Sequence, residues 1–181
     1  LLEEQYRMHP DIMNLSNQLF YDGRLRSGVQ ASDRTFVDGS PVEFVPVFGD
    51  DSSARRNAAE AEAITSRVKT YLAAGVAAAS IGVISPFRAQ VALLKQQLHG
   101  FGISVDTVER FQGGERDVIL MSLVRGQCSS FVLDERRFNV AITRARRKLV
   151  LVANPNLFQN TRYAWIAPMP GAAAAAGGRV V

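Results

Sequence analysis

The second half of the chain alternates short apolar segments with amphipathic ones, and this alternation limits the possible folds more than any other feature. It predicts strands at 81–85, 103–108, 118–123 and 149–153 and helices at 86–98, 134–146 and 155–160. The strand segments are apolar at consecutive positions, which is typical of strands buried on both faces. We therefore expect an α/β fold whose central, mostly parallel sheet carries helices on both faces.

The first half of the chain has fewer such elements. Apolar residues at helical spacing predict a helix over 11–20, and Val42–Val47 is a short strand candidate. Asn57 and Glu60 resemble an N-cap and its reciprocal partner at the start of a further helix. Ser85 and Pro86 predict a third helix start, with serine as the cap and proline at the first helical position.

Composition limits the class of protein. Hydrophobic residues make up 47% of the 181 residues, enough for the core of one compact domain, and no apolar run is long enough to span a membrane. The chain starts with neither Met nor a basic leader, so we expect it to begin inside a larger, intracellular protein of the cytoplasm or nucleus. Cys128, His9 and His99 have no metal-ligand spacing. Residues 161–181 are rich in Ala and Gly towards their end and are predicted to be a disordered, low-complexity tail.

Positive charge is concentrated late in the chain. The formal net charge is +4, and the segment 134–148 contains six basic and two acidic residues. Such a segment suits a polyphosphate partner, although a solvated helix face gives the same composition. If 134–146 is one helix, Arg137 and Arg144 share a face, where two guanidinium groups could grip a phosphate. Two solvated arginines are the alternative.

Three motifs occur together in a fixed order. They are Gln-Tyr-Arg-Met-His-Pro at 5–10, Thr-Val-Glu-Arg-Phe-Gln-Gly-Gly-Glu at 107–115, and Phe-Asn-Val-Ala-Ile-Thr-Arg-Ala at 138–145. The set resembles the second RecA-like domain of superfamily 1 helicases, subclass B, in the up-frameshift-like group. The resemblance covers about residues 1–158. It implies a C-terminal RecA-like domain of the P-loop NTPase fold over 1–160, in which 1–41 forms a helix and loop on the interdomain side.

The resemblance assigns roles to two arginines. It makes Arg144 an arginine finger that reaches the γ-phosphate of ATP bound on the other domain, where such a charge stabilises the transition state. It places Arg7 at the same phosphate, whereas the residues alone also allow an interdomain salt bridge. We treat Arg7 and Arg144 as the catalytic candidates.

The resemblance also implies binding residues. Glu115 is expected to approach the nucleotide, most simply its ribose, with Gly113 allowing a close backbone approach. Arg137 is a further candidate for nucleotide contact from the residues alone. Many relatives have a basic residue where this chain has Gly114. The group Ser85, Pro86 and Thr107 is expected to contact the backbone of single-stranded RNA or DNA. An ordinary capped helix start and a strand-exit turn are the structural alternatives.

The sequence lacks half of an ATPase site. It has no Gly-x-x-x-x-Gly-Lys-Ser/Thr segment and no strand followed by Asp-Glu, so ATP and Mg²⁺ would be held mainly by a first RecA-like domain that is absent from it. We expect an ATP-dependent helicase or translocase as the parent protein and an inactive isolated chain. A truncated, non-catalytic module that binds nucleic acid or protein is the main alternative. A RecA-like ATPase without unwinding is a weaker one.

Overall fold

The computed structural model describes residues 4–48, 55–111, 114–124, 134–159, 167–175 and 179–180. Within them, parallel strands form a main sheet in the order β5-β4-β6-β7-β3-β8. The strands of this sheet are β3 (Val42–Pro46), β4 (Ile81–Ile84), β5 (Ser104–Asp106), β6 (Arg116–Ser122), β7 (Ala145–Ala153) and β8 (Arg179–Val180). Two further strands, β1 (Glu4–Gln5) and β2 (Arg26–Ser27), pair with each other in parallel.

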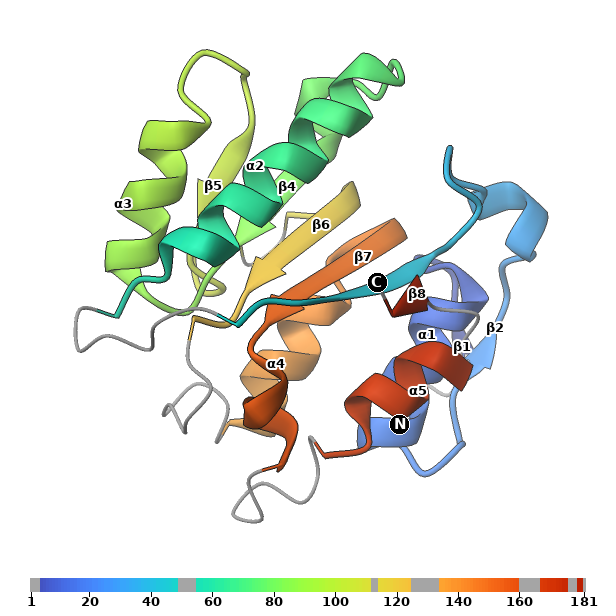
Figure 1. The fold of residues 1–181 in the computed structure, drawn as a ribbon. Coiled ribbons are helices and arrows are strands. Elements are labelled where there is room, and N and C mark those ends of the chain that lie inside the picture. Colours follow the sequence, from blue (N-terminus) through green and yellow to red (C-terminus); the bar gives the residue numbers. More distant parts are fainter. Residues whose placement is uncertain are drawn as a thin grey trace.

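Helices cover both faces of the sheet. The α-helices are α1 (Pro10–Phe20), α2 (Ala58–Ala73), α3 (Arg88–Gln97), α4 (Glu135–Ile142) and α5 (Met169–Ala175). Shorter 3-10 helices are η1 (Ala31–Arg34), η2 (Ala78–Ser80) and η3 (Pro155–Gln159). Figure 1 shows α2 and α3 on one side of the sheet and α1, α4 and α5 on the other. None of the described helices is both long and apolar enough to cross a membrane.

The central strands bury both of their faces, as the sequence predicted. On β6, Ile119 and Met121 join the core that includes α1 and α4, whereas Val118 and Leu120 join the core that includes α2 and α3. Successive side chains of a strand point to opposite faces, so each central strand contributes to two cores. The expected α/β architecture of the RecA-like type is therefore confirmed.

The start of α2 agrees with the prediction only in part. Asn57 caps the helix, since its Oδ1 accepts a hydrogen bond from the Glu60 N–H at 3.1 Å. The Glu60 carboxylate does not return to the cap. It is buried, and its Oε2 accepts hydrogen bonds from Ser122 Oγ at 2.6 Å and from the Val124 N–H at 2.9 Å. Glu60 therefore ties the start of α2 to the end of β6.

Two predicted boundaries are wrong. The helix α3 begins at Arg88 with Phe87 as its N-cap residue, so Ser85 and Pro86 belong to the preceding turn rather than to the helix start. The helix predicted over 134–146 ends at Ile142, and β7 already begins at Ala145. Phe138, Ile142, Ala145 and Leu149 are buried in one core as expected, but they come from a helix and a strand rather than from one helical stripe.

Buried ion pairs explain the early start of β7. Lys148 is fully buried, with its Nζ 2.7 Å from Asp38 Oδ2, 2.7 Å from the Ser40 carbonyl oxygen and 3.2 Å from Glu43 Oε2. Each contact lies far from Lys148 in sequence, which is why local pattern could not show it. The basic segment 134–148 is therefore not a continuous exposed surface, because its last residue is internal.

The C-terminal part differs from the predicted disordered tail where it is described. Residues 169–175 form α5, Met169 is buried in the core, and β8 pairs with β3. Alanine is the strongest helix former, so a low-complexity segment beside an apolar anchor can still form a helix. The division of the chain at residue 160 stays a prediction.

Candidate functional site

Two of the motif residues lie at the amino-terminal edge of the sheet. Glu115 directly precedes β6 and Arg144 directly precedes β7. The strands are paired so that Arg116 lies opposite Ala145, and the Arg116 N–H donates to the Arg144 carbonyl oxygen at 3.1 Å. The strand pairing therefore brings the two motifs together.

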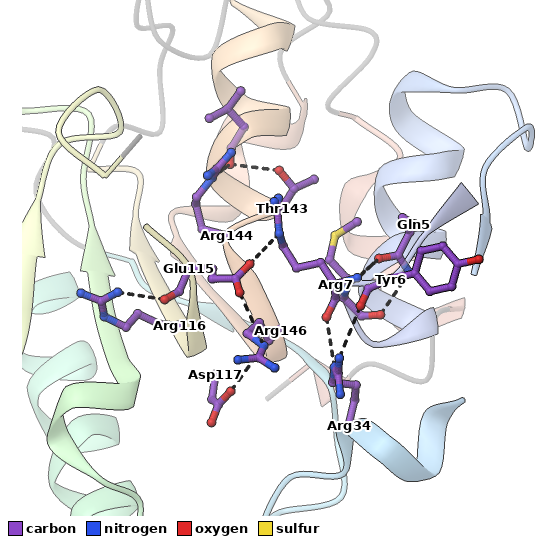
Figure 2. A network of polar contacts seen from close by, with 12 residues as sticks. Gln5, Tyr6, Arg7, Arg34, Glu115, Arg116, Asp117, Thr143, Arg144 and Arg146 are labelled. Carbon is purple, nitrogen blue, oxygen red and sulfur yellow. Dashed lines mark hydrogen bonds and ion pairs between the residues drawn. The ribbon is translucent and has the colours of Figure 1, made fainter. Parts of the chain in front are cut away.

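Arg7 reaches the same edge from the N-terminal segment. The His9 N–H donates to the Arg146 carbonyl oxygen at 2.8 Å, which fastens the turn before α1 to β7. Arg7 Nε then lies 2.6 Å from Glu115 Oε2 in an ion pair at the surface. Figure 2 shows Arg7, Glu115 and Arg144 gathered from three segments of the chain.

Gln5 shapes the turn that presents Arg7. Its Oε1 accepts hydrogen bonds from the N–H groups of Arg7 at 2.9 Å and Met8 at 2.7 Å, and its Nε2 donates to the Met8 carbonyl oxygen at 3.1 Å. Arg34 holds the outside of the turn, donating from Nε to the Arg7 carbonyl oxygen at 3.1 Å. Sequence reasoning found no role for Gln5. A polar side chain two residues before an expected ligand was the available signal.

Tyr6 and Met8, the neighbours of Arg7, differ in burial. Met8 is buried in the core beside α1. The Tyr6 side chain is 64% exposed, although its ring lies so close to Gly28 that a Cβ there would overlap it. Met8 is therefore a packing residue, whereas Tyr6 is packed only on the side that faces Gly28.

Arg144 is held in place at one end only. Its Nε donates to the Val140 carbonyl oxygen at 3.0 Å, and the side chain is partly buried. Burial lowers the pKa of Arg144, the nearby positive charge of Arg7 lowers it further, and Glu115 opposes both effects. A second guanidinium group and a desolvated site make this position favourable for an anion such as phosphate.

The edge is not the one that the general rule for open α/β sheets predicts. Ligands of such sheets bind at the carboxyl ends of the strands, so the rule predicts the arginines there. They lie instead at the amino ends of β6 and β7. Arg144 lies in the turn between α4 and β7, and this turn leads into the amino end of β7. Arg137 and Arg144 accordingly do not share a helix face.

The other expected nucleotide contacts are less well placed or are not described. Arg137, on α4, forms an ion pair with Glu109. Gly113 lies outside the described residues, whereas Gly114 is described. No group of three metal-ligating side chains occurs within the described ranges.

The three expected nucleic-acid contacts lie at the opposite, carboxyl-terminal edge. Ser85 follows β4 and Thr107 follows β5, with the Ser85 N–H donating to the Asp106 carbonyl oxygen at 3.3 Å. Ser85 is fully buried, and its Oγ accepts from the Phe87 N–H at 3.4 Å. Pro86 is half-buried, and Thr107, 9% exposed, lines a hollow beside α3. The sheet thus separates the two sets of candidate residues.

Much of the late basic segment is neutralised within the domain. Arg146 Nε lies 3.9 Å and Arg147 Nε 3.6 Å from Asp117 Oδ1 on the neighbouring strand. Arg147 also donates to the Thr35 carbonyl oxygen at 3.2 Å. These pairs hold β6, β7 and the loop before β3 together, so charge counted along the sequence overstates the free positive surface.

Comparison with known proteins gives a consistent result. A protein family described as an AAA domain matches residues 1–156. An uncharacterized ATP-dependent helicase of Methanocaldococcus jannaschii is 35% identical over 90% of this chain and 28% of its own length. The regulator of nonsense transcripts 1 homolog of Drosophila melanogaster is 36% identical over 86% of this chain and 15% of its own length. The chain thus spans less than a third of these relatives.

Two further comparisons concern DNA helicases. The DNA polymerase alpha-associated DNA helicase A of Saccharomyces cerevisiae is 33% identical over 87% of this chain and 28% of its own length. The crystal structure of the C-terminal domain of a possible DNA helicase from Lactobacillus plantarum WCFS1 superposes with a TM-score of 0.55, at 13% identity, over 83% of this chain and 88% of that one. That likeness shows the fold. The chain therefore belongs to the AAA domain family, as the second RecA-like domain of an up-frameshift-like superfamily 1 helicase.

Proposed function

We propose that this chain is the C-terminal motor half of an ATP-dependent RNA or DNA helicase or translocase. In this proposal it supplies Arg7 and Arg144 to ATP bound on a first RecA-like domain of the same parent chain. The observation that carries the proposal is the convergence of Arg7, Glu115 and Arg144 at the amino ends of β6 and β7. The positive charge of Arg7 contributes to lowering the pKa of Arg144, and a phosphate placed between the two cations would offset this repulsion.

Arg144 suits the role of the finger. Its Nε is anchored on Val140, while no described residue accepts a hydrogen bond from its terminal nitrogens Nη1 and Nη2. These donors are therefore available to a γ-phosphate, where they would stabilise the charge of the transition state. Arg7 would contact the same phosphate, and this contact would couple phosphate binding to the turn that is fastened to β7.

Glu115 would contact the nucleotide ribose once Arg7 moves to the phosphate. Arg146 Nε lies 4.0 Å from Glu115 Oε1, so Glu115 keeps a positive neighbour after Arg7 leaves. In this proposal ATP is the cofactor together with Mg²⁺, and the first domain holds the metal. Gly113 and Arg137 remain proposed nucleotide contacts, the latter after release from Glu109.

The opposite edge of the sheet would grip single-stranded RNA or DNA through Ser85, Pro86 and Thr107. Because Ser85 is buried, we propose that it acts through the backbone of the turn it supports, while Thr107 contacts the strand directly. Closure of the two domains on ATP and their release after hydrolysis would move the strand in steps. Such a substrate implies an intracellular setting, in the cytoplasm or nucleus.

The test uses the parent protein with both motor domains. Arg144→Ala should lower ATP turnover, stimulated by single-stranded RNA or DNA, by about 10³-fold or more while ATP binding changes only slightly. Arg147→Ala is the matched control and should retain turnover, because Arg147 pairs with Asp117. Retained turnover in Arg144→Ala would refute the finger. The 181-residue chain alone should show no ATPase activity. If nucleic acid does not stimulate ATP turnover by the parent protein, an ATPase without unwinding is favoured.

A further inference from the structure

A hollow of about 230 Å³ lies between α3 and the turn that follows β5. Its basic lining consists of Arg88 and Lys95 from α3 and Arg110 from the turn. Thr107 also lines it, so the hollow adjoins a residue already proposed to contact nucleic acid. The three basic side chains are exposed.

This hollow forms a groove whose positive charge is largely uncompensated. Asp106 is the only carboxylate in the lining, and its Oδ2 lies 3.9 Å from Lys95 Nζ, at the limit of an ion pair. Within the part of the chain that the structure describes, neither Arg88 nor Arg110 has a hydrogen-bond or ion-pair partner. The nearby Glu109 is paired with Arg137 and is therefore not a partner of the groove.

This pattern contrasts with that of several arginines elsewhere in the fold. Arg7, Arg67, Arg146 and Arg147 each have a carboxylate within 4.0 Å. Three exposed cations beside a single carboxylate attract an anion, because no protein partner must first be displaced.

The shape of the groove favours a linear polyanion over a single phosphate. Arg88 and Lys95 are seven residues apart on α3, which corresponds to about 10 Å along the helix axis. Val91 and Ala92 lie between them and give the groove an apolar floor. Cations along the sides and an apolar floor suit the phosphates and sugars of an extended strand.

We infer that Arg88, Lys95 and Arg110 form a phosphate track that continues the grip on single-stranded nucleic acid from Thr107 along α3. This inference rests on the proposed function. It extends the nucleic-acid site to Arg88 and Lys95, which lie outside the three motifs, and to Arg110, which lies within the second motif. The contacts are to the backbone, so the track binds RNA and DNA without reading base sequence.

The test measures binding of the 181-residue chain to fluorescent oligo-dT and oligo-U by anisotropy over a range of salt concentrations. The variant carries Arg88→Gln, Lys95→Gln and Arg110→Gln. The matched control carries Arg24→Gln, Arg26→Gln and Lys69→Gln, which are exposed and lie on other elements. Circular dichroism and thermal unfolding confirm that both variants fold.

The groove variant should bind at least about tenfold more weakly than the control at low salt, with the slope of log affinity against log salt reduced by about 2, because each phosphate contact on a single strand contributes about 0.7. Equal binding by the two variants, while Thr107→Val weakens binding, would overturn the track and leave the proposed function intact. A chain that binds neither oligonucleotide would overturn both.

Discussion

Arg7 and Glu115, which belong to different motifs, form an ion pair with Arg7 Nε 2.6 Å from Glu115 Oε2. Their side chains are 45% and 41% exposed, and exposed pairs of this kind contribute only about 0–1 kcal/mol to stability. The pair therefore orients both side chains towards one edge of the sheet at little cost to their later separation. A site that must admit a nucleotide benefits from such a weak contact.

The first prediction separates function from stability at this pair. Arg7→Ala should change the free energy of unfolding by less than about 1 kcal/mol, because the pair is exposed. In the parent protein the same change should slow ATP turnover by about tenfold or more, since it removes a phosphate contact. Urea unfolding of the chain and steady-state turnover of the parent measure the two effects.

The matched control for this pair is Arg24→Ala. Arg24 Nη2 lies 3.4 Å from Asp22 Oδ2, also at the surface, in the loop between α1 and β2. It should leave both stability and turnover nearly unchanged. If the loss of turnover in Arg7→Ala is fully explained by a smaller fraction of folded protein, Arg7 is a structural residue and its assigned role is wrong.

The fold could be predicted because consecutive apolar residues within each strand segment indicate that the strand is buried on both faces. Ile119 and Leu120 are adjacent and both apolar, and they lie in different cores on opposite faces of β6. Local caps were also visible, as at Asn57. Both signals involve only a few neighbouring residues, so they can be recognised in the sequence without any knowledge of tertiary contacts.

The position of Arg144 could not be predicted from local pattern. The charged segment from Thr143 to Lys148 favours a helix by composition, yet β7 begins at Ala145. That strand is stabilised by Asp117 beside Arg146 and Arg147, and by Asp38 and Glu43 around Lys148. These partners are distant in sequence, so the turn that carries Arg144 was misplaced.

The second prediction concerns Gly82 on β4. A Cβ at this position would lie 2.8 Å from Phe111 Cζ and 2.9 Å from Ile119 Cδ1. Gly82→Ala should therefore destabilise the domain by about 1–3 kcal/mol, because both neighbours are buried. Urea unfolding measures the loss. Gly114→Ala is the control and should cost less stability, since the nearest neighbour of its Cβ would be 3.4 Å away. An equally small loss in Gly82→Ala would mean that Phe111 moves aside freely.

The third prediction concerns the buried cation of β7. Lys148→Met should destabilise the domain by about 3–5 kcal/mol, because it leaves Asp38 and Glu43 without their shared partner. Arg147→Met, on the adjacent and partly exposed position, should cost less than about 1 kcal/mol. Chemical unfolding of both variants gives the comparison. The double variant Asp38→Asn/Lys148→Met should recover part of the loss, and a full loss in Arg147→Met would contradict the assignment of Lys148 as the central cation.

The last prediction concerns pH and the helix cap at His9. His9 Nδ1 accepts a hydrogen bond from the Asp11 N–H at 3.1 Å at the start of α1, which requires an unprotonated Nδ1. Burial lowers the pKa of His9, and the carboxylate of Asp11 opposes this shift. The neutral form is therefore favoured in the folded chain. Its contribution to stability is complete above the unfolded pKa of about 6.5 and is lost as the pH falls through the lower folded pKa.

His9→Asn replaces this cap with one that does not titrate. Urea unfolding at several values between about pH 7.5 and 5 should show stability falling less steeply with acidification in His9→Asn than in the unchanged chain. His99→Asn changes the other histidine, which is exposed after α3, and serves as the control for a histidine-to-asparagine change outside the cap. Parallel profiles for His9→Asn and the unchanged chain would show that His9 does not titrate against the cap, because the acid-dependent loss would then arise from groups that both proteins share.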